Sequence, residues 1–372
     1  MAEPSGSLPA EDILHMRSAL ALARRGLGNT WPNPSVGCVV VKDGRVVGRA
    51  VTAPGGRPHA EPAALGMAGD AAKGATAYVT LEPCSHWGRT PPCTDAMIAA
   101  GISRVVIATR DPDPRVDGAG IAKLRTAGIG IDEGLLRSEA DELVAGFRAR
   151  VRLGRPLVTL KLASTLDGRI ATHSGESRWI TGKAARRAAH ALRGRHDAVM
   201  VGVGTVLADN PLLTCRLPGY RATPAVRIIA DSHLRTPLTS ALVATAGEVP
   251  TWILLRQGTD RERRRAFADL GVTLIEVAGA EAGVDAAAAL KALGDAGLTR
   301  VLLEGGAQLA ASLLRADLVD RVAWFHAPTV MGADAWPAVQ AFGVERLEAM
   351  PRFARVAETP LAEDMLTELA RR

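Results

Sequence analysis

The sequence has 372 residues, of which 47% are hydrophobic and 23% charged, a composition typical of folded globular proteins. This composition excludes a disordered or low-complexity chain, and the length predicts two domains. The formal net charge of +6 would suit a nucleic-acid-binding protein, but only six of the 45 basic residues are lysine and the aromatic share is 3%. Because single-strand binders stack bases on aromatic side chains, we expect no nucleic-acid partner.

The cysteine content and the absence of long apolar runs indicate a protein of a reducing compartment. Four cysteines in a chain of this length do not form a disulfide framework. No apolar run reaches the ~18 residues of a membrane helix, and the N-terminus has no basic start followed by an apolar stretch. We therefore expect a cytoplasmic protein without a membrane partner.

The first 150 residues alternate between segments of helical and of strand period. Asp43-Gly44, between two β-rich runs, predicts a tight hairpin, and Ser138 followed by Asp141 predicts a capped helix start. Strands alternating with helices predict an α/β/α sandwich. Its expected helices are 11–25, 61–68, 94–100, 121–127 and 138–150, and its expected strands are 36–41, 46–47, 77–81, 104–108 and 129–132.

Gly154-Arg155-Pro156 is the best linker candidate, because the alternation of strands and helices restarts after it. We therefore predict one domain at 1–150 and a second α/β domain at 151–372. In the second domain we expect helices at 183–192, 285–293 and 307–314, and strands at 157–162, 198–203, 227–230, 251–255, 272–276, 300–304, 322–326 and 365–369.

A candidate metal site lies in the first domain. His59 and Glu61 begin a predicted helix, Cys84 follows a strand, and Cys93 precedes a helix. Three nitrogen and sulfur ligands leave a fourth position open, as in catalytic zinc sites. Glu61 could reach a water at that position without binding the metal. A lone His or Cys is more often packed or exposed than a ligand, but the combination favours a zinc hydrolase. A non-catalytic, zinc-stabilised binding protein is the alternative, and it would need a fourth ligand such as His86.

The pattern His59-Ala-Glu61 with Pro-Cys84 and Cys93 resembles the zinc-dependent nucleobase and nucleoside deaminases. Eight residues separate the two cysteines, and the segment 81–93, Leu-Glu-Pro-Cys-Ser-His-Trp-Gly-Arg-Thr-Pro-Pro-Cys, resembles the bifunctional riboflavin-biosynthesis deaminase/reductases. Asn33-Pro-Ser-Val-Gly-Cys-Val resembles their substrate-side segment. The resemblance implies His59, Cys84 and Cys93 as zinc ligands, Glu61 as the catalytic residue and Asn33 as a substrate contact.

Two turns and one charge stand out in the second half. Gly202-Val-Gly-Thr205 is a weak dinucleotide fingerprint, because Leu207 occupies the place of the third small residue. Gly305-Gly306, between a strand and a helix, would let the backbone approach a phosphate, although taken alone this pattern favours an ordinary turn. Lys161 lies inside a predicted strand, where a charge needs a function or a partner.

Together these features resemble the reductase half of the same family, which is similar in fold to dihydrofolate reductase. The resemblance implies Zn²⁺ and NADPH as cofactors and a homo-oligomer formed through the reductase half. It implies zinc-hydroxide deamination of 2,5-diamino-6-(5-phosphoribosylamino)pyrimidin-4-one, followed by reduction of the ribosyl group to ribityl. A nucleic-acid or nucleoside deaminase with an accessory domain is the second alternative. The implied residues are Lys161 and Asp209 in catalysis, Ala163, Trp179, Thr205, Asp209, Ser232, Gly305, Gly306, Ala307, Gln308 and Leu309 in NADPH binding, and Ser177, Arg193, Leu213, Arg216 and Glu304 in substrate binding.

Overall fold

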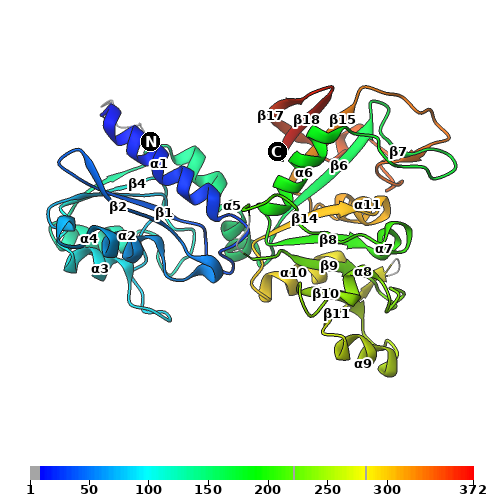
Figure 1. Cartoon of the computed structure of the whole chain (residues 1–372), viewed down its shortest axis with the longest axis horizontal. Coiled ribbons are helices and arrows are strands. Elements are labelled where there is room, and N and C mark those ends of the chain that lie inside the picture. The colour runs from blue at the N-terminus through cyan, green and yellow to red at the C-terminus, as the bar shows by residue number, and fades with distance from the viewer. Residues whose placement is uncertain (1–8, 221–222, 281–282) are drawn as a thin grey trace. The chain divides into compact units, whose positions relative to one another are not determined.

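The computed structural model describes residues 9–220, 223–280 and 283–372. The chain forms two compact units, Met1–Leu153 and Gly154–Arg372 (Figure 1). The division falls at Gly154 because the last helix of the first unit continues to Leu153. Gly154 has a φ of 69°, a left-handed conformation that commonly follows the end of a helix and that glycine adopts without strain.

The first unit contains a five-stranded sheet in the order β2-β1-β3-β4-β5. Its first two strands form the predicted antiparallel hairpin, and β3, β4 and β5 are mutually parallel. The strands are β1 (Gly37–Lys42), β2 (Arg45–Val51), β3 (Thr76–Val79), β4 (Arg104–Ile107) and β5 (Gly130–Glu133). The helices are α1 (Ala10–Gly26), α2 (Ala60–Ala68), α3 (Cys93–Ala99), α4 (Ala119–Thr126) and α5 (Arg137–Leu153), with short 3₁₀ turns η1 (Pro54–Gly56) and η2 (Gly69–Ala72).

Helices cover both faces of this sheet, because successive side chains of a strand point to opposite sides. On one face, Val39 and Tyr78 belong to a core shared with α1 and α5. On the other face, Val40 and Val79 pack with residues of α2, α3 and α4. Figure 1 shows these three helices together on one side of the first unit. The structure thus confirms the predicted α/β/α sandwich.

The second unit contains a nine-stranded sheet in the order β11-β10-β9-β8-β14-β6-β15-β18-β17. All strands from β11 to β15 in that order are parallel, and β18 and β17 complete the sheet as an antiparallel hairpin. The strands are β6 (Leu157–Thr165), β8 (Ala198–Gly202), β9 (Val226–Ala230), β10 (Thr251–Arg256), β11 (Thr273–Val277), β14 (Arg300–Gly305), β15 (Arg321–Ala327), β17 (Phe353–Leu361) and β18 (Asp364–Arg371). The short pairs are β7 (Arg169–Ala171) with β16 (Trp336–Pro337), and β12 (Gly279–Ala280) with β13 (Gly283–Val284).

The helices of the second unit are α6 (Lys183–Gly194), α7 (Val203–Asp209), α8 (Ala241–Ala244), α9 (Arg261–Asp269), α10 (Ala286–Asp295) and α11 (Ala307–Arg315), with the turn η3 (Leu347–Ala349). Because β6, β8, β9 and β14 are parallel, their carboxyl ends share one edge of the sheet. Ligands of parallel α/β sheets bind at this edge. The loops after β8, β9 and β14 carry much of the expected reductase site.

Two predicted details are wrong, and some helices are not predicted at all. The strand expected at 198–203 ends at Gly202, and the unpredicted α7 begins directly after it. Helix α9 is not predicted either, because Phe267 is its single buried residue and no apolar period is visible. The predicted cap at Ser138 lies inside α5, which begins at Arg137, and Asp141 instead accepts a hydrogen bond from Thr109 Oγ1 at 2.7 Å.

A buried carboxylate ties α1 to the sheet of the first unit. Asp12 is 3% exposed and accepts hydrogen bonds from Tyr78 Oη at 2.6 Å and from both terminal nitrogens of Arg104 at 3.0 and 2.7 Å. The hydrogen bonds from Arg104 lower the pKa of Asp12 below its ordinary value of 3.8. The ionised group therefore stabilises the folded unit.

We expect Asp12→Asn to lower the free energy of unfolding of the first unit by about 1–3 kcal/mol at pH 7. Because the folded-state pKa is depressed, the contribution of Asp12 is complete above its ordinary pKa and is lost as the pH falls through the folded-state value. The difference between wild type and variant should therefore be constant near neutral pH and shrink in acid. Urea unfolding of the full chain at several pH values measures it, and an undiminished difference in strong acid would contradict the assignment.

Candidate functional site

Three potential metal ligands of the first unit converge at two helix starts. His59 directly precedes α2, Cys93 is the first residue of α3, and Cys84 lies in the segment after β3. One nitrogen and two sulfur atoms from these side chains all lie within 4.8 Å of one another. His59 Nδ1 is 3.3 Å from Cys93 Sγ and 3.8 Å from Cys84 Sγ. Nitrogen and sulfur ligands of one tetrahedral zinc ion are about 3.6 Å apart, so the donor set fits zinc.

The two sulfur atoms differ in their electrostatics. Hydrogen bonding from the Cys93 thiol lowers the pKa of Cys84 to about 4, against the opposing effect of burial. The same interaction and burial raise the pKa of Cys93. The backbone N–H of Cys93 also donates to Cys84 Sγ at 3.3 Å. One thiolate is therefore stabilised before any metal binds, which favours the uptake of a cation.

Glu61 lies in the first turn of α2 and is 3% exposed. Its Oε2 atom is buried without a hydrogen-bond partner, and burial raises the pKa of Glu61 to about 7. A carboxyl group with such a pKa can both accept and donate a proton near neutral pH. His86 does not join the cluster: among the described residues, only His59, Cys84 and Cys93 form a group of potential ligands.

Asn33 lies against the imidazole of His59. Asn33 Nδ2 donates to the carbonyl oxygen of Gly56 at 2.8 Å and is 3.3 Å from His59 Nε2. Gly56 has a φ of 84°, and a Cβ atom there would lie 2.8 Å from Asn33. Asn33 thus contacts the nitrogen of His59 that faces away from the cysteines, where groups that orient a ligating histidine are usual.

In the second unit, the turns after β8 and β14 approach each other. A Cβ atom on Gly305 would lie 2.8 Å from Thr205 Oγ1, so only glycine fits beside that hydroxyl group. Gly306 has a φ of 94° and directly precedes α11. The following residues Ala307, Gln308 and Leu309 form the first turn of α11, whose N–H groups have no partner within the helix. Such a helix start can receive a phosphate group.

A charged cluster lies at the end of β14. Arg193 and Glu304 form a bidentate ion pair, with Nε to Oε1 at 2.5 Å and Nη2 to Oε2 at 2.8 Å. Their side chains are 17% and 6% exposed. Burial opposes the ionised form of Glu304, but Arg193 outweighs it and lowers the pKa of Glu304. Arg193 also donates to the carbonyl oxygen of Thr214, next to the buried Leu213. Lys161 on β6 interacts electrostatically with both members of the pair.

Asp209 and Trp179, two further residues expected in the reductase site, are more exposed than Arg193 and Glu304. Asp209 ends α7, is 46% exposed, and lies 3.8 Å from Arg178. Trp179 is exposed, with the Arg186 guanidinium 4.4 Å from its ring centre. The remaining expected residues are Ser177 in an exposed segment, Ala163 on β6, Ser232 after β9 beside Gly283, and Arg216 beside His190 on α6.

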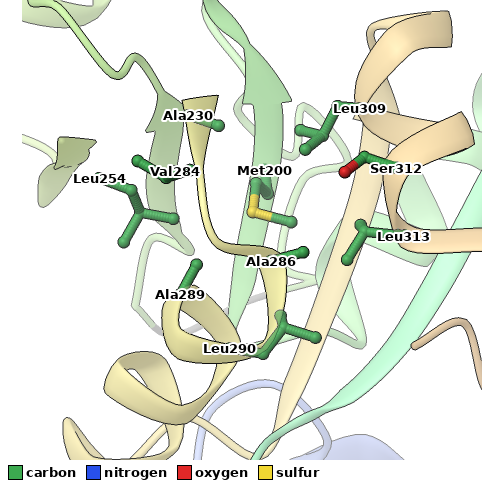
Figure 2. A pocket seen from close by; sticks show the side chains of 10 residues that line it. All are labelled: Met200, Ala230, Leu254, Val284, Ala286, Ala289, Leu290, Leu309, Ser312 and Leu313. Carbon is green, nitrogen blue, oxygen red and sulfur yellow. The ribbon is translucent and has the colours of Figure 1, made fainter. Parts of the chain in front are cut away.

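An apolar pocket adjoins Leu309 on the α10 and α11 side of the sheet. Figure 2 shows Met200 of β8 between side chains of α11 and side chains of β9, β10 and the segment before α10. Its lining residues are Met200, Ala230, Leu254, Val284, Ala286, Ala289, Leu290, Leu309, Ser312 and Leu313. Leu309 belongs both to this pocket and to the expected cofactor turn.

Comparison with known sequences identifies the architecture. A profile of the RibD C-terminal domain matches residues 156–365, which is more than half of the chain. The chain belongs to the RibD family. A profile of the cytidine and deoxycytidylate deaminase zinc-binding region matches residues 9–109.

Full-length RibD relatives support this assignment. The riboflavin biosynthesis protein RibD of Aquifex aeolicus is 43% identical over 355 residues, 95% of this chain and 97% of that protein. RibD of Escherichia coli is 43% identical over 92% of this chain and 95% of its own length. Among solved structures, Acinetobacter baumannii RibD has a TM-score of 0.85 at 38% identity, covering 97% of this chain and 99% of that chain. A Thermotoga maritima deaminase/reductase has a TM-score of 0.83 at 36% identity, with the same coverage.

This RibD-family chain is a bifunctional deaminase and reductase of riboflavin biosynthesis that uses Zn²⁺ and NADPH. The predicted fold class and function are thereby confirmed. Within the part of the chain that the structure describes, no helix combines the length and the apolar character needed to cross a membrane.

Several contacts of these sites are not visible in the sequence. Arg193 and Glu304 are both expected to bind substrate, and the structure shows them paired with each other. Gly56 behind Asn33 is not predicted, because nothing in the turn Pro-Gly-Gly distinguishes a packed glycine from a merely flexible one. A positive φ together with a close neighbour becomes visible only in three dimensions.

We expect Arg193→Lys to destabilise the second unit by about 1–3 kcal/mol, because lysine cannot form the bidentate pair with Glu304. Arg195→Lys is the matched control: Arg195 is exposed and donates to Tyr220 Oη at 2.9 Å. Its effect should stay within about 0.5 kcal/mol. Urea unfolding of the full chain compares the two, and equal effects would show that the buried pair adds no stability.

Proposed function

We propose that residues 1–150 deaminate 2,5-diamino-6-(5-phosphoribosylamino)pyrimidin-4-one, and that residues 151–372 then reduce the ribosyl group of the product to ribityl. The observation that carries the first step is the convergence of His59, Cys84 and Cys93 beside the unpartnered carboxyl oxygen of Glu61. The Thermotoga maritima relative is described as a diaminohydroxyphosphoribosylaminopyrimidine deaminase and 5-amino-6-(5-phosphoribosylamino)uracil reductase. Those names supply the substrate class of the proposal.

In the deaminase site, His59, Cys84 and Cys93 would hold zinc, which would act as a Lewis acid and make water nucleophilic at neutral pH. Glu61 takes the proton of the attacking water at its free Oε2 atom. It returns a proton to the amino group as the carbon–nitrogen bond breaks and ammonia leaves. The burial that raises the pKa of Glu61 to about 7 suits both transfers. Asn33 orients the pyrimidine next to His59.

In the reductase site, bound NADPH would be the hydride source for reduction at C1′ of the ring-opened sugar. The turn Gly305-Gly306, the start of α11 and Thr205 bind the cofactor, with Ala163, Trp179, Ser232 and Asp209 as further contacts. The group of Arg193, Leu213, Arg216, Ser177 and Glu304 orients the substrate. Lys161 and Asp209 hold or deliver the proton that accompanies hydride transfer. Lys161 is suited to this because burial lowers its pKa.

We further propose that the enzyme works in the cytoplasm, as a homo-oligomer that associates through the reductase unit. It needs no nucleic-acid or membrane partner for these reactions. Light scattering of the purified chain measures the oligomeric state, and a monomer at micromolar concentration would contradict the proposed association.

Incubation of the purified protein with the diamino substrate tests the order of the two reactions. Ammonia should be released without NADPH, and NADPH absorbance should fall only after deamination has occurred. Ammonia release that requires NADPH would contradict two separate sites. Tight, salt-dependent RNA binding would favour the alternative of a nucleic-acid deaminase.

We expect Glu61→Gln to lower ammonia release by at least about 100-fold, because the proton carrier is lost while the zinc ligands remain. Its zinc content and its NADPH oxidation on pre-deaminated substrate should match the wild type. Lys161→Met is the reciprocal variant, with normal ammonia release and impaired NADPH oxidation. If either folded variant loses both activities, the assignment of separate sites is wrong.

A further inference from the structure

Glu82 is a buried acidic residue that takes part in none of the steps above. It is 2% exposed, and each of its two carboxyl oxygens accepts two backbone hydrogen bonds. Its own N–H group donates to the carbonyl oxygen of Thr109 at 2.9 Å. The four donors are the N–H groups of Gly120 at 2.9 Å, Gly118 at 3.0 Å, Ile121 at 3.2 Å and Asp111 at 3.3 Å.

Three of these donors belong to the start of α4, where N–H groups have no partner within the helix. The contact is close: a Cβ atom on Gly120 would lie 2.1 Å from the carbonyl oxygen of Pro83 and 3.1 Å from Glu82 Oε1. Helix α4 itself contributes no ligand atom to the cluster of His59, Cys84 and Cys93. Its first turn nevertheless packs directly against the backbone that leads into Cys84.

Cys84 is held from its other side by α3. Its carbonyl oxygen accepts hydrogen bonds from Thr94 N at 3.2 Å and Thr94 Oγ1 at 3.3 Å. Its sulfur accepts a hydrogen bond from the N–H group of Cys93. Only Pro83, whose ring fixes φ, separates Cys84 from Glu82. The position of the sulfur is therefore set by two helix starts, one on each side.

We propose that Glu82 is a positioning residue of the zinc site. Its hydrogen bonds hold the start of α4 against the backbone that leads into Cys84, and thereby fix the position of Cys84 Sγ relative to His59 and Cys93. The inference rests on the proposed role of these three residues as zinc ligands. Residues that do not bind the metal themselves but orient its ligands commonly contribute about 10–100-fold to metal affinity. A merely structural role would change stability and leave the metal site unaltered.

Glu82→Gln tests the proposal with an isosteric change. In either orientation of the glutamine amide, its NH₂ group faces two backbone N–H donors. In the wild type, a carboxyl oxygen of Glu82 accepts the hydrogen bonds of these two donors, so the variant leaves them without an acceptor. We expect zinc affinity, measured by competition with a chromophoric chelator, to fall about 10–100-fold. The visible bands of the Co²⁺-substituted protein should shift as well. Gly120→Ala should act in the same direction, because its methyl group would displace Pro83.

Asp12→Asn is the matched control, since Asp12 is an equally buried carboxylate of the same unit with no link to the cluster. It should lose stability but keep its zinc affinity and its cobalt spectrum. Wild-type affinity and an unchanged spectrum in folded Glu82→Gln would overturn the proposal. If that variant does not fold, the same result for Gly120→Ala would overturn it.

His59→Ala separates this inference from the proposed zinc site. If His59→Ala binds zinc like the wild type, the assigned ligand set is wrong. If His59→Ala loses zinc while Glu82→Gln retains wild-type affinity and spectrum, only the positioning role of Glu82 is wrong. Reduction of pre-deaminated substrate reports in each variant whether the second unit is folded.

Discussion

The chemistry of the first unit depends on the way helix starts meet at one edge of its sheet. His59 precedes α2, Cys93 opens α3, and α4 begins beneath the segment that carries Cys84. Backbone N–H groups at these starts have no partner within their helices, so they bond to sulfur and to carboxyl oxygen instead. The ligand atoms therefore come within 4.8 Å of one another through backbone geometry.

The second unit contains a buried pair of opposite charges, Arg193 and Glu304. Glu304 lies near the carboxyl end of the parallel strand β14, where it is almost fully buried and its charge would be unstable without a partner. Arg193 provides that partner through two parallel hydrogen bonds, and Lys161 adds a second positive charge nearby. The two hydrogen bonds hold both side chains in one geometry, which would reduce the rearrangement needed on binding at the proposed substrate site.

The sequence predicts most of the fold, because buried strands and amphipathic helices carry strong periodic signals. Helix α9 is not predicted, because Phe267 is its only buried residue and the helix therefore has no apolar period. Helix α7 is not predicted, because its first residues look like a glycine-bearing turn. The grouping of His59, Cys84 and Cys93 is predictable from their chemistry and from the resemblance to the deaminases. The hydrogen bonds of Glu82 are not, because their donors lie 29 to 39 residues further along the chain and nothing local marks the residue as buried.

The deaminase chemistry proposed for the first unit requires zinc bound by one imidazole and two thiolates, with one position open to solvent. X-ray absorption spectroscopy of the zinc-loaded full chain can measure this ligand set, because sulfur and the lighter oxygen and nitrogen scatterers differ in distance from zinc, about 2.3 Å against about 2.0–2.1 Å. We expect two sulfur neighbours, a single imidazole and one exchangeable oxygen. A second imidazole, such as that of His86, in place of the oxygen would rule out an open site and support a closed structural one.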